Sequence, residues 1–502
     1  MPVPTVKPQA TLLEVGPARM LTADDMQQDM QKRGAAYPTS NPSKRGVKPF
    51  YPTMGAAKYK GYKTQLAAKT GVKRRTSGAT TEVKPLTQVH VVSPDFDGSD
   101  DIDFLVPPDT HGARGVDEFV EVTNTHVDIY RSNPTSHTIM ELPALFGGYS
   151  AAGMSDPRVV YDRWWSRWVI TVMGLPESST VQNHFIAISQ TPSALGGFWL
   201  YAFNVTFNPG DLWDFPQLGM DQDAVIITAN IFDALGNYKG ADMFSIAKAR
   251  LYNGWGWGAT LFTNLAGTLA PPIVLDQNDT TFLVAAPFDA NALQLYALQN
   301  SSQLPSLTGP ISVPVSAYTA PPPAPQPGTN DPANLVDTSD GRFVNASTQT
   351  GNFLWQVHSV NLGGLPTPVY YQINTATNSV AQSGAFYASA TSSDFNASIA
   401  ASSENDAFVT WTSIDPPNGI NAQVRYSGCD HNDGACVISA GTALFTSPTF
   451  LADDFDPNFG MQRWGDYSAV TVDPLNDRQA WLVNEKIDAN QDWGSHIGDI
   501  GF

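Results

Sequence analysis

The chain of 502 residues has little cysteine, few charged side chains and no long apolar run. Without a stretch of about 18 apolar residues, no membrane-spanning helix is expected. The sequence contains no Gly-x-Ser-x-Gly elbow, His-Glu-x-x-His helix, P-loop or dinucleotide fingerprint, so the common signatures of serine hydrolases, zinc proteases and nucleotide-dependent enzymes are missing. Residues 1–30 include no apolar segment of the signal-peptide kind. We expect that the numbering starts at a mature N-terminus or that export uses no standard signal.

Only two cysteines are present, Cys429 and Cys436, separated by six mostly polar residues. The ends of such a short, turn-prone loop meet easily, so we expect a local disulfide and, with it, an oxidising compartment. The alternative is a pair of free thiols in a surface loop. Two thiolates with His431 between them do not complete a zinc site, which needs four ligands.

Charge is distributed unevenly along the chain. Residues 1–86 contain 15 lysines and arginines against 5 aspartates and glutamates, a net charge of +10, whereas the remaining residues contain 13 against 42, a net of −29. A basic arm thus precedes an acidic body, and the acidic body argues against a nucleic-acid-binding domain. Alone, the arm is expected to be partly disordered and to become ordered by docking on an acidic surface. A short helix to about Arg33 is expected after Thr22 as N-cap, with Asp25 three residues later.

From about residue 87 the sequence consists of short apolar runs and turns, which indicates many β-strands. Aromatic residues make up 11%, and glycine and proline number 40 and 38, a composition typical of such folds. A strand–turn–strand unit recurs, with starts near residues 115, 156, 217, 272, 340, 396 and 463. Its spacing of about 40–70 residues is the size of a four-stranded propeller blade with its loops.

These units predict an all-β fold, a seven-bladed β-propeller, because a closed ring removes the exposed edges of its sheets. A β-sandwich pair or two smaller propellers are the alternatives. We expect two regions, a basic and mostly irregular arm at residues 1–86 and the propeller at residues 87–502. The proline-rich stretch 320–328 is interpreted as an extended connection between blades, since the same unit resumes after it.

Three phrases of the sequence carry a family resemblance: DPRVVYDRWWSRWVI from Asp156, WDFPQLGMDQDAVIITANIF from Trp213, and RWGDYSAVTVDP from Arg463 with AWLVNEK after it. They look like phrases of large, mostly uncharacterised secreted bacterial proteins with a sialidase-like β-propeller, over roughly residues 87–500. The resemblance implies that fold and a glycoside-hydrolase ancestry. The Asp-box of sialidases, Ser-x-Asp-x-Gly-x-x-Trp, is absent, so the resemblance extends to the fold more than to sialidase activity.

Charged and aromatic residues recur at the unit starts, where a propeller gathers side chains at one end of its channel. If the units are in phase, these side chains converge on one funnel. The candidates for catalytic work on a glycosidic bond are Asp156, Asp221, Asp466 and Tyr467. The candidates for ligand binding are Arg158, Arg342, Arg463 and Trp464.

Guanidinium groups match carboxylates in geometry, so the arginines are expected to hold a ligand carboxylate, as the resemblance to sialidase-like sites implies. The rings of Trp464 and Tyr467 are expected to stack on a sugar. The alternative is structural: aspartates and arginines that pair with each other or cap loops, and tryptophans that belong to the core.

The segment from Asp95 to Asp103 places oxygen-bearing side chains at alternate positions and resembles a calcium loop. Its candidate ligands are Asp95, Asp97, Ser99 and Asp101. Glycine stands at its fourth position instead of its sixth, and Val106 stands at the twelfth, where a glutamate is expected. Calcium is the one cofactor predicted, with solvated acidic turns as the alternative.

Two functions of different classes follow. The first is an extracellular or cell-surface β-propeller that binds a glycan or a cell-surface polymer and that, if it is an enzyme, is a sialidase-like glycoside hydrolase. The second is structural: residues 1–86 of one copy dock on the acidic propeller of a neighbour, which gives a homo-oligomeric layer, fibre or coat. Neither function involves nucleic acid or a transmembrane segment.

Overall fold

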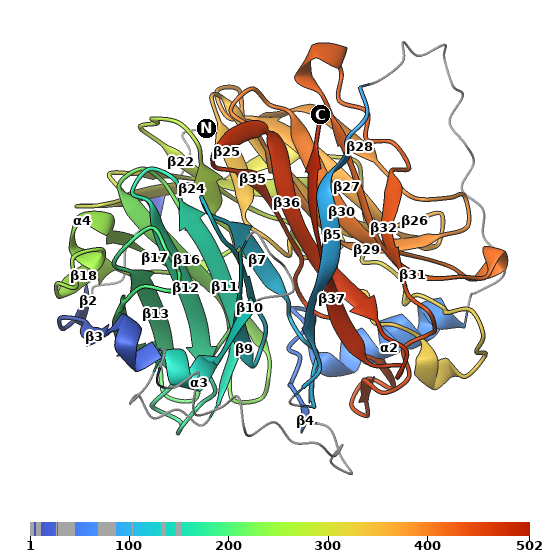
Figure 1. The fold of residues 1–502 in the computed structure, drawn as a ribbon, viewed down its shortest axis with the longest axis horizontal. Coiled ribbons are helices and arrows are strands. Elements are labelled where there is room, and N and C mark those ends of the chain that lie inside the picture. The colour runs from blue at the N-terminus through green and yellow to red at the C-terminus, as the bar shows by residue number, and fades with distance from the viewer. Residues whose placement is uncertain are drawn as a thin grey trace.

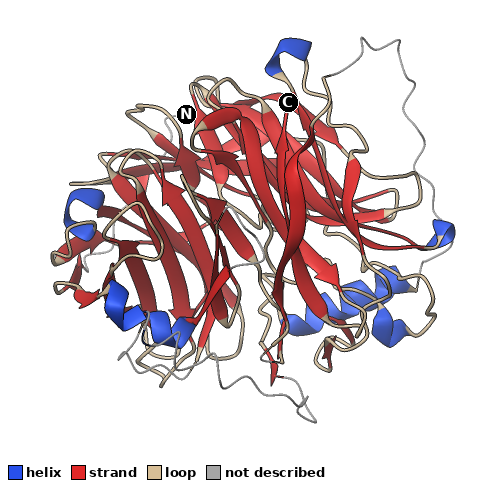
Figure 2. Cartoon of the chain, in the orientation of Figure 1, coloured by secondary structure: helices blue, strands red, loops and turns tan. Residues whose placement is uncertain are grey.

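Runs of β-branched and aromatic residues, separated by turns rich in glycine, asparagine and proline, make β-strands the dominant element of the fold (Figure 2). The computed structural model describes residues 5–6, 12–26, 28, 46–68, 87–102, 104–131, 137–146 and 153–502. Antiparallel sheets stand side by side (Figure 1). Their innermost strands line a cavity. The predicted all-β, propeller-like fold is confirmed.

Seven groups of antiparallel strands occur among the described residues. Group 1 contains β7 (His111–Arg114), β8 (Phe119–Val122), β9 (His126–Tyr130) and β10 (His137–Glu141). Group 2 contains β11 (Met154–Asp162), β12 (Arg167–Gly174), β13 (Asn183–Ser189) and β14 (Phe198–Asn204). Group 3 contains β15 (Leu212–Met220), β16 (Ala224–Phe232), β17 (Tyr238–Ala247) and β19 (Phe262–Leu265). Group 4 contains β20 (Leu269–Ala270), β22 (Thr281–Ala285), β23 (Ala292–Gln299) and β24 (Ser306–Pro314).

The remaining groups come from the second half of the chain. Group 5 contains β25 (Ser347–Thr350), β26 (Phe353–Leu362), β27 (Leu365–Asn374) and β28 (Ser379–Ala385). Group 6 contains β29 (Ser393–Ala401), β30 (Ala407–Asp415), β31 (Ile420–Cys429) and β32 (Thr442–Thr446). Group 7 contains β35 (Ala469–Asp473), β36 (Asn476–Ile487), β37 (Trp493–Gly501) and β5 (His90–Asp100).

Groups 3 and 5 are not separate sheets. The short strand β21 (Pro272–Val274) pairs in parallel with both β15 and β25 and joins the two groups into one nine-stranded sheet. For this reason the predicted count of seven blades stays a prediction, although the innermost strands of the groups begin close to the expected unit starts.

Strand β5 closes the ring. It precedes group 1 in the chain but pairs antiparallel with the C-terminal strand β37, so the two lie side by side as blue and red ribbons in Figure 1. The two ends of the propeller region are thereby tied into one sheet, and the outer edge of β37 is covered.

The remaining elements outside the arm are short. They are α3 (Leu142–Leu145), α4 (Lys248–Leu251), β6 (Leu105–Val106), β18 (Trp257–Thr260), β33 (Phe455–Asp456), β34 (Met461–Gln462), and the 3₁₀ turns η1 (Pro332–Asn334), η2 (Pro416–Asn418) and η3 (His431–Asp433). Across the part of the chain that the structure describes, no helix has the length and apolar character needed to cross a membrane.

The basic arm docks on the propeller of its own chain. Its strands β1 (Thr5–Val6), β2 (Leu12–Val15) and β3 (Arg19–Leu21) pair antiparallel with β24, β18 and β14. Farther along, β4 (Gly46–Val47) pairs in parallel with β6, and α2 (Ala56–Ala67) follows (Figure 1). Docking on an acidic surface was predicted; docking on a second copy stays a prediction.

The expected N-cap of the arm is present. The backbone N–H of Asp25 donates to Thr22 Oγ1 over 3.1 Å, and the backbone N–H of Thr22 donates to Asp25 Oδ2 over 3.0 Å. This is a capping box with aspartate in the place of glutamate. Residues 23–26 are helical, and the expected continuation to Arg33 lies outside the described residues.

The proline-rich stretch 320–328 connects groups 4 and 5, as predicted, but most of it is buried. It forms part of the surface on which α2 rests. The Lys63 ammonium donates to the carbonyl of Pro321 over 3.0 Å, and the Tyr62 hydroxyl donates to the carbonyl of Ala320 over 3.1 Å. Carbonyl groups of an extended chain, left without strand partners, thus serve as acceptors for the arm.

The predicted disulfide is confirmed. Cys429 ends β31, and its sulfur is bonded to that of Cys436, with the two Cα atoms 5.3 Å apart. Both cysteines are buried and pack in the apolar cluster of groups 5 and 6 that contains Trp355 and Trp411.

Replacing both cysteines by serine is expected to lower the free energy of unfolding by about 2–3 kcal/mol, because the loop that the bond closes is short. Chemical denaturation of the double variant and of the wild type under oxidising conditions measures the difference. A matched Ser439→Ala variant, which alters the connection between β31 and β32 outside the disulfide loop and keeps the bond, serves as the control. Equal midpoints for the double variant and the wild type would contradict the prediction.

Candidate functional site

A non-glycine residue with a positive φ angle lies at the N-terminal end of four groups. Asp109, Asp156, Phe215 and Asn396 have φ values of 51°, 57°, 53° and 49°. For three of them the pairing of the first two strands shifts register at that point, the mark of a β-bulge, which changes the direction of side chains. Aspartate and asparagine tolerate this conformation, but phenylalanine rarely adopts it, so Phe215 is held there by its surroundings.

Hydrogen bonds link these positions from group to group. The Asn124 side chain donates to Asp109 Oδ2 over 2.7 Å and accepts the backbone N–H of Asp156 over 2.8 Å. The Asp156 carboxylate accepts the backbone N–H of Phe215 over 3.1 Å. Asp109 Oδ1 accepts the backbone N–H of Asp466 over 2.6 Å, which joins the segment before group 7 to group 1. The buried aspartates therefore tie neighbouring groups together.

The centre of this end of the ring is occupied by Lys48 of the arm. Its ammonium lies 2.8 Å from Asp109 Oδ2, makes an ion pair and hydrogen bond with Asp156, and lies 3.7 Å from Asp466 Oδ2. All of these side chains are buried. The pairing of β4 with β6 sets the position, because the Lys48 backbone N–H continues that pairing to the carbonyl of Val106.

The three predicted arginines surround the same centre. Arg158 stacks on Tyr467, with its guanidinium carbon 3.3 Å from the ring centre. Arg342 lies 4.5 Å from the ring centre of Phe215, and both Arg342 and Arg463 lie about 5 Å from that of Phe50 in the arm. The three arginines, which come from the starts of different units, thus lie near one another, and their role in ligand binding stays a prediction.

Each arginine, however, already has acceptors from its own chain. Arg342 donates two 2.8 Å hydrogen bonds to Asp340, and Arg463 lies 3.4 Å from Asp466. Arg158 donates to two backbone carbonyls over 3.0 Å. Because the arginines are paired in this way, the cluster does not hold three free cations ready for one ligand carboxylate.

In the cluster around Lys48, carboxylates outnumber cations, and the pKa values of these carboxylates are shifted in different directions. Burial raises the pKa of Asp109, but the charges of Lys48 and Arg463 outweigh burial and hold that pKa below its ordinary value. Burial, with the Asp109 charge, raises the pKa of Asp466 to about 6. Burial also raises the pKa of Asp214. One carboxyl that stays ionised beside one that titrates near neutral pH is an arrangement suited to general acid–base chemistry.

Two other predicted residues lie in structural surroundings. The Asp221 carboxylate accepts the backbone N–H groups of Asp223 and Ala224 over 2.9 and 2.7 Å, which stabilises the turn between β15 and β16. Trp464 is buried in an apolar cluster, with its ring 5.5 Å from that of Phe395. Asp221 is therefore engaged in its turn, and the Trp464 ring is covered and not presented for stacking. The catalytic and ligand-binding roles assigned to these residues stay predictions.

The arm covers the cluster. The carbonyl of Tyr51 accepts from Arg342 over 3.0 Å, and Thr53 donates from its backbone to Asp340 over 2.9 Å. In α2, Lys63 is fully buried and lies 3.4 Å from Asp337, and the Tyr59 hydroxyl also bonds Asp337. No motif of the sequence marks Lys48 or Asp109, and the high basic content of the arm is the signal that points toward Lys48.

The predicted calcium segment is a strand and not a loop. In β5 the side chains of Asp95 and Asp97 both bond the ring of His496, over 2.7 and 2.8 Å, and Asp97 lies 3.1 Å from the Lys486 ammonium. Ser99 bonds the carboxylate of Asp128 on the neighbouring group. Strand residues two apart are separated by about 6.6 Å, so this backbone does not wrap round one ion. Calcium binding stays a prediction.

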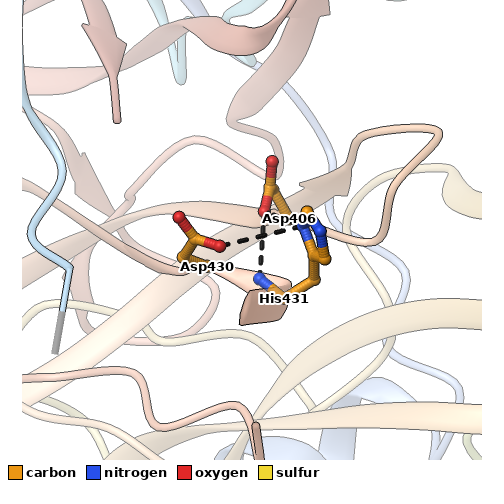
Figure 3. Close-up of side chains that lie close together, drawn as sticks. All are labelled: Asp406, Asp430 and His431. Atoms are coloured by element: carbon orange, nitrogen blue, oxygen red, sulfur yellow. Dashed lines mark hydrogen bonds and ion pairs between the residues drawn. The ribbon is translucent and has the colours of Figure 1, made fainter. Parts of the chain in front are cut away.

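One group of three potential metal ligands occurs among the described residues: Asp406, Asp430 and His431 (Figure 3). His431 Nδ1 lies 2.7 Å from Asp406 Oδ1. Arg478 of β36 reaches both carboxylates, at 3.2 Å from Asp406 and 2.7 Å from Asp430. The Arg478 guanidinium thus provides the positive charge that a metal would supply. These ion pairs link strand group 6 to strand group 7.

No protein-family model matches the chain, and no curated protein matches its sequence. Its structure is similar to a protein of unknown function from Dyadobacter fermentans, with a TM-score of 0.39 and 8% identity over 70% of this chain and 94% of that one. It is similar to the Trypanosoma rangeli sialidase in complex with sialic acid, with a TM-score of 0.36 and 10% identity over 75% of this chain and 57% of that one.

The Penicillium chrysogenum α-L-arabinanase complexed with arabinobiose is also similar, with a TM-score of 0.36 and 9% identity over 83% of this chain and 98% of that one. The structural neighbours thus include a sialidase and an arabinanase. Likenesses with TM-scores below 0.5 do not carry an activity from one protein to another. Membership of the secreted bacterial family stays a prediction.

Changing Lys48 to Met removes the ammonium and keeps a side chain of similar length. The variant is expected to lose about 3–5 kcal/mol of folding free energy at neutral pH, because Asp109 and Asp156 stay buried without their cation. Chemical denaturation measures the loss. Lys60→Met is the control, since Lys60 is an exposed residue of α2 whose ammonium, among the residues that the structure describes, donates to the backbone carbonyl of Asn458. The midpoint of this variant should stay close to that of the wild type.

The folding free energy lost in the Lys48→Met variant should depend on pH. In the wild type the lowered pKa of Asp109 gives a contribution to stability that is present above the pKa of the unfolded carboxyl and disappears as the pH falls. In the variant, protonation removes the unpaired charge. The difference in free energy of unfolding should therefore shrink as the pH is lowered toward about 4; a difference that grows would contradict the assignment of Lys48 as the counter-ion.

Proposed function

We propose that the protein is an extracellular or cell-surface β-propeller that binds a glycan, with glycoside-hydrolase ancestry, and that its ligand site is the charged cluster beneath residues 46–63 of the arm. One observation carries the proposal. Aspartates from different groups surround the Lys48 ammonium, beside paired arginines and the ring of Tyr467. So many buried ionisable groups in one place are costly for folding, and such clusters are found preferentially at functional sites.

The balance of charge favours one class of glycan. The arginines are already paired with carboxylates or carbonyl groups of the chain, and Lys48 supplies the remaining cation. With the arm displaced, the cluster has an excess of carboxylates. A sugar with hydroxyl or ammonium groups at the place of the Lys48 ammonium suits this environment, whereas an acidic sugar would meet like charges.

Displacing residues 46–63 of the arm from the charged cluster should increase glycan binding. A Phe50→Ala, Tyr59→Ala double variant removes two rings that pack on each other and on Phe459, and changes no residue of the propeller. On an array of neutral, amino-containing and acidic glycans, this variant is expected to bind more strongly than the wild type, and neutral or amino-containing glycans more strongly than acidic ones. Met20→Ala, an exposed change in β3, is the matched arm control and should behave as the wild type.

A further Asp156→Asn change in the opened variant should abolish the binding. Circular dichroism and melting curves verify that every variant is folded. The glycan proposal fails if the folded, opened variant binds nothing on the array, or if its binding is unaffected by Asp156→Asn.

A second candidate function is self-assembly through the arm, and the strand pairings favour it. The arm strands β1 and β3 add to β24 and β14, the last strands of groups 4 and 2. The same pairings made between copies would exchange identical elements, as in domain swapping, and would produce a homo-oligomer.

Light scattering at increasing protein concentration tests self-assembly. An assembly held by exchanged arms should grow with concentration and dissociate in the Lys48→Met variant, because the arm loses its buried ion pairs. The Lys60→Met variant should assemble as the wild type does. A monomer at every concentration would exclude this function and leave the glycan proposal untouched.

A further inference from the structure

The ring has a cavity at the end of its axis opposite residues 46–63 of the arm. The innermost strands begin at the charged cluster and end at this cavity: β11 runs from Asp156 toward Asp162, and β29 runs past Asn396 to Ala401. Six of the seven groups contribute to the lining, through β7, β11, β15, β25, β29 and β35 or the residues beside them, and the joining strand β21 contributes as well. The cavity is therefore a channel along the axis, separate from the site under the arm.

The wall of this channel is mostly aliphatic. Representative lining residues are Val160, Met220, Val274, Ala400 and Val470. Such a surface, enclosed by strands from six groups and by β21, is typical of pockets for apolar ligands.

The polar groups of the wall are mostly satisfied within the protein. Asp162 pairs with Lys248 over 2.6 Å and accepts the Tyr252 hydroxyl over 2.7 Å. His111 bonds the side chain of Asn345 over 2.9 Å. The hydroxyl of Ser347 is buried and makes no hydrogen bond within the described part of the chain. The interior thus offers few polar partners to a ligand.

Large apolar side chains stand exposed at the mouth of the channel. Trp164 and Trp165, in the turn between β11 and β12, are 49% and 41% exposed, and Leu475, in the turn between β35 and β36, is 70% exposed. Trp164 also lines the cavity. Arg163 and Asp477 form an ion pair over 3.2 Å that ties these two turns together. Exposed apolar groups gathered at a cavity mark a binding surface.

The size of the channel limits the ligand. The cavity offers about 90 Å³ to the centres of water molecules, and about 10–15 Å³ of such space holds one water, so it has room for roughly six to nine waters. A methylene group needs about as much space as a water molecule. A single unbranched chain of roughly six to nine carbons therefore matches the cavity.

We propose that this channel binds an unbranched aliphatic chain of that length, with the Trp164 ring covering the chain at the mouth and a polar head group remaining outside beside Arg114 and Arg163. A sugar ring would need several hydrogen-bonding partners inside the channel, and the wall provides few. An unbranched aliphatic chain occurs both in a free fatty acid and in the acyl tail of a lipid. The site is independent of the glycan site under the arm.

Isothermal titration of the full-length protein with octanoate, 1-octanol and octyl glucoside tests the proposal, and the order of the three affinities shows whether the mouth of the channel prefers an anion, a hydroxyl or a sugar as head group. All three are expected to bind with a negative heat-capacity change, which marks burial of apolar surface. Butanoate and butanol should bind at least tenfold more weakly, because half of the apolar chain is missing.

Two variants locate the site. Ala400→Leu narrows the channel and should weaken octanoate binding at least tenfold, and Trp164→Ala should weaken it about fivefold. Trp255→Ala is the control, because Trp255 is 57% exposed and does not line the cavity; its affinity should stay within about twofold of the wild type. Since Trp164 is an exposed turn residue, its variant remains informative if Ala400→Leu does not fold.

The proposal is overturned if octanoate, octanol and octyl glucoside all fail to bind the folded wild type. It is also overturned if Trp164→Ala and Trp255→Ala bind octanoate equally well, or if free sugars without an alkyl chain bind at Trp164 as strongly as octyl glucoside does. The Phe50→Ala, Tyr59→Ala variant should bind octanoate as the wild type does, which separates this site from the one under the arm.

Discussion

The ion pairs of Lys48 are the interaction on which one whole end of the molecule depends. Aspartates at the starts of two groups and before a third lie close to the ring axis, where like charges would repel one another without a cation between them. Lys48 supplies that cation from a distant part of the chain. Its position is fixed by the pairing of β4 with β6, and the aromatic contacts of Phe50 and Tyr59 hold the same segment in place.

The two ends of the axis differ because the same innermost strands change character along their length. At their starts, left-handed residues and bulges bring polar side chains together, and the arm covers them. Beyond the bulges the regular pleat resumes and the strands present aliphatic residues to the channel. One end is therefore charged and closed by the chain itself, and the other is apolar and bordered by exposed tryptophans.

Much of the fold is predictable from local patterns. Alternating apolar runs gave most of the strands, the short polar loop between Cys429 and Cys436 gave the disulfide, and Thr22 with Asp25 gave a cap. At the candidate site, prediction was partial. Arg158, Arg342 and Arg463 lie around one centre, Asp221 accepts hydrogen bonds within a turn, and the segment of Asp95 is a strand. Nothing in the sequence marked Asp109.

Local sequence patterns specify the strands, turns and caps of this protein, because period-two alternation, turn residues and capping depend on neighbours a few positions apart. Which charged side chains meet depends on how the whole chain folds. The Lys48 ammonium and the Asp466 carboxylate are separated by more than 400 residues in the chain, and their contact exists because ring closure by β5 and β37 and the docking of the arm bring both to the axis. Such pairing depends on long-range geometry, and a net charge of +10 against −29 indicates only that an attraction exists, not which side chains satisfy it.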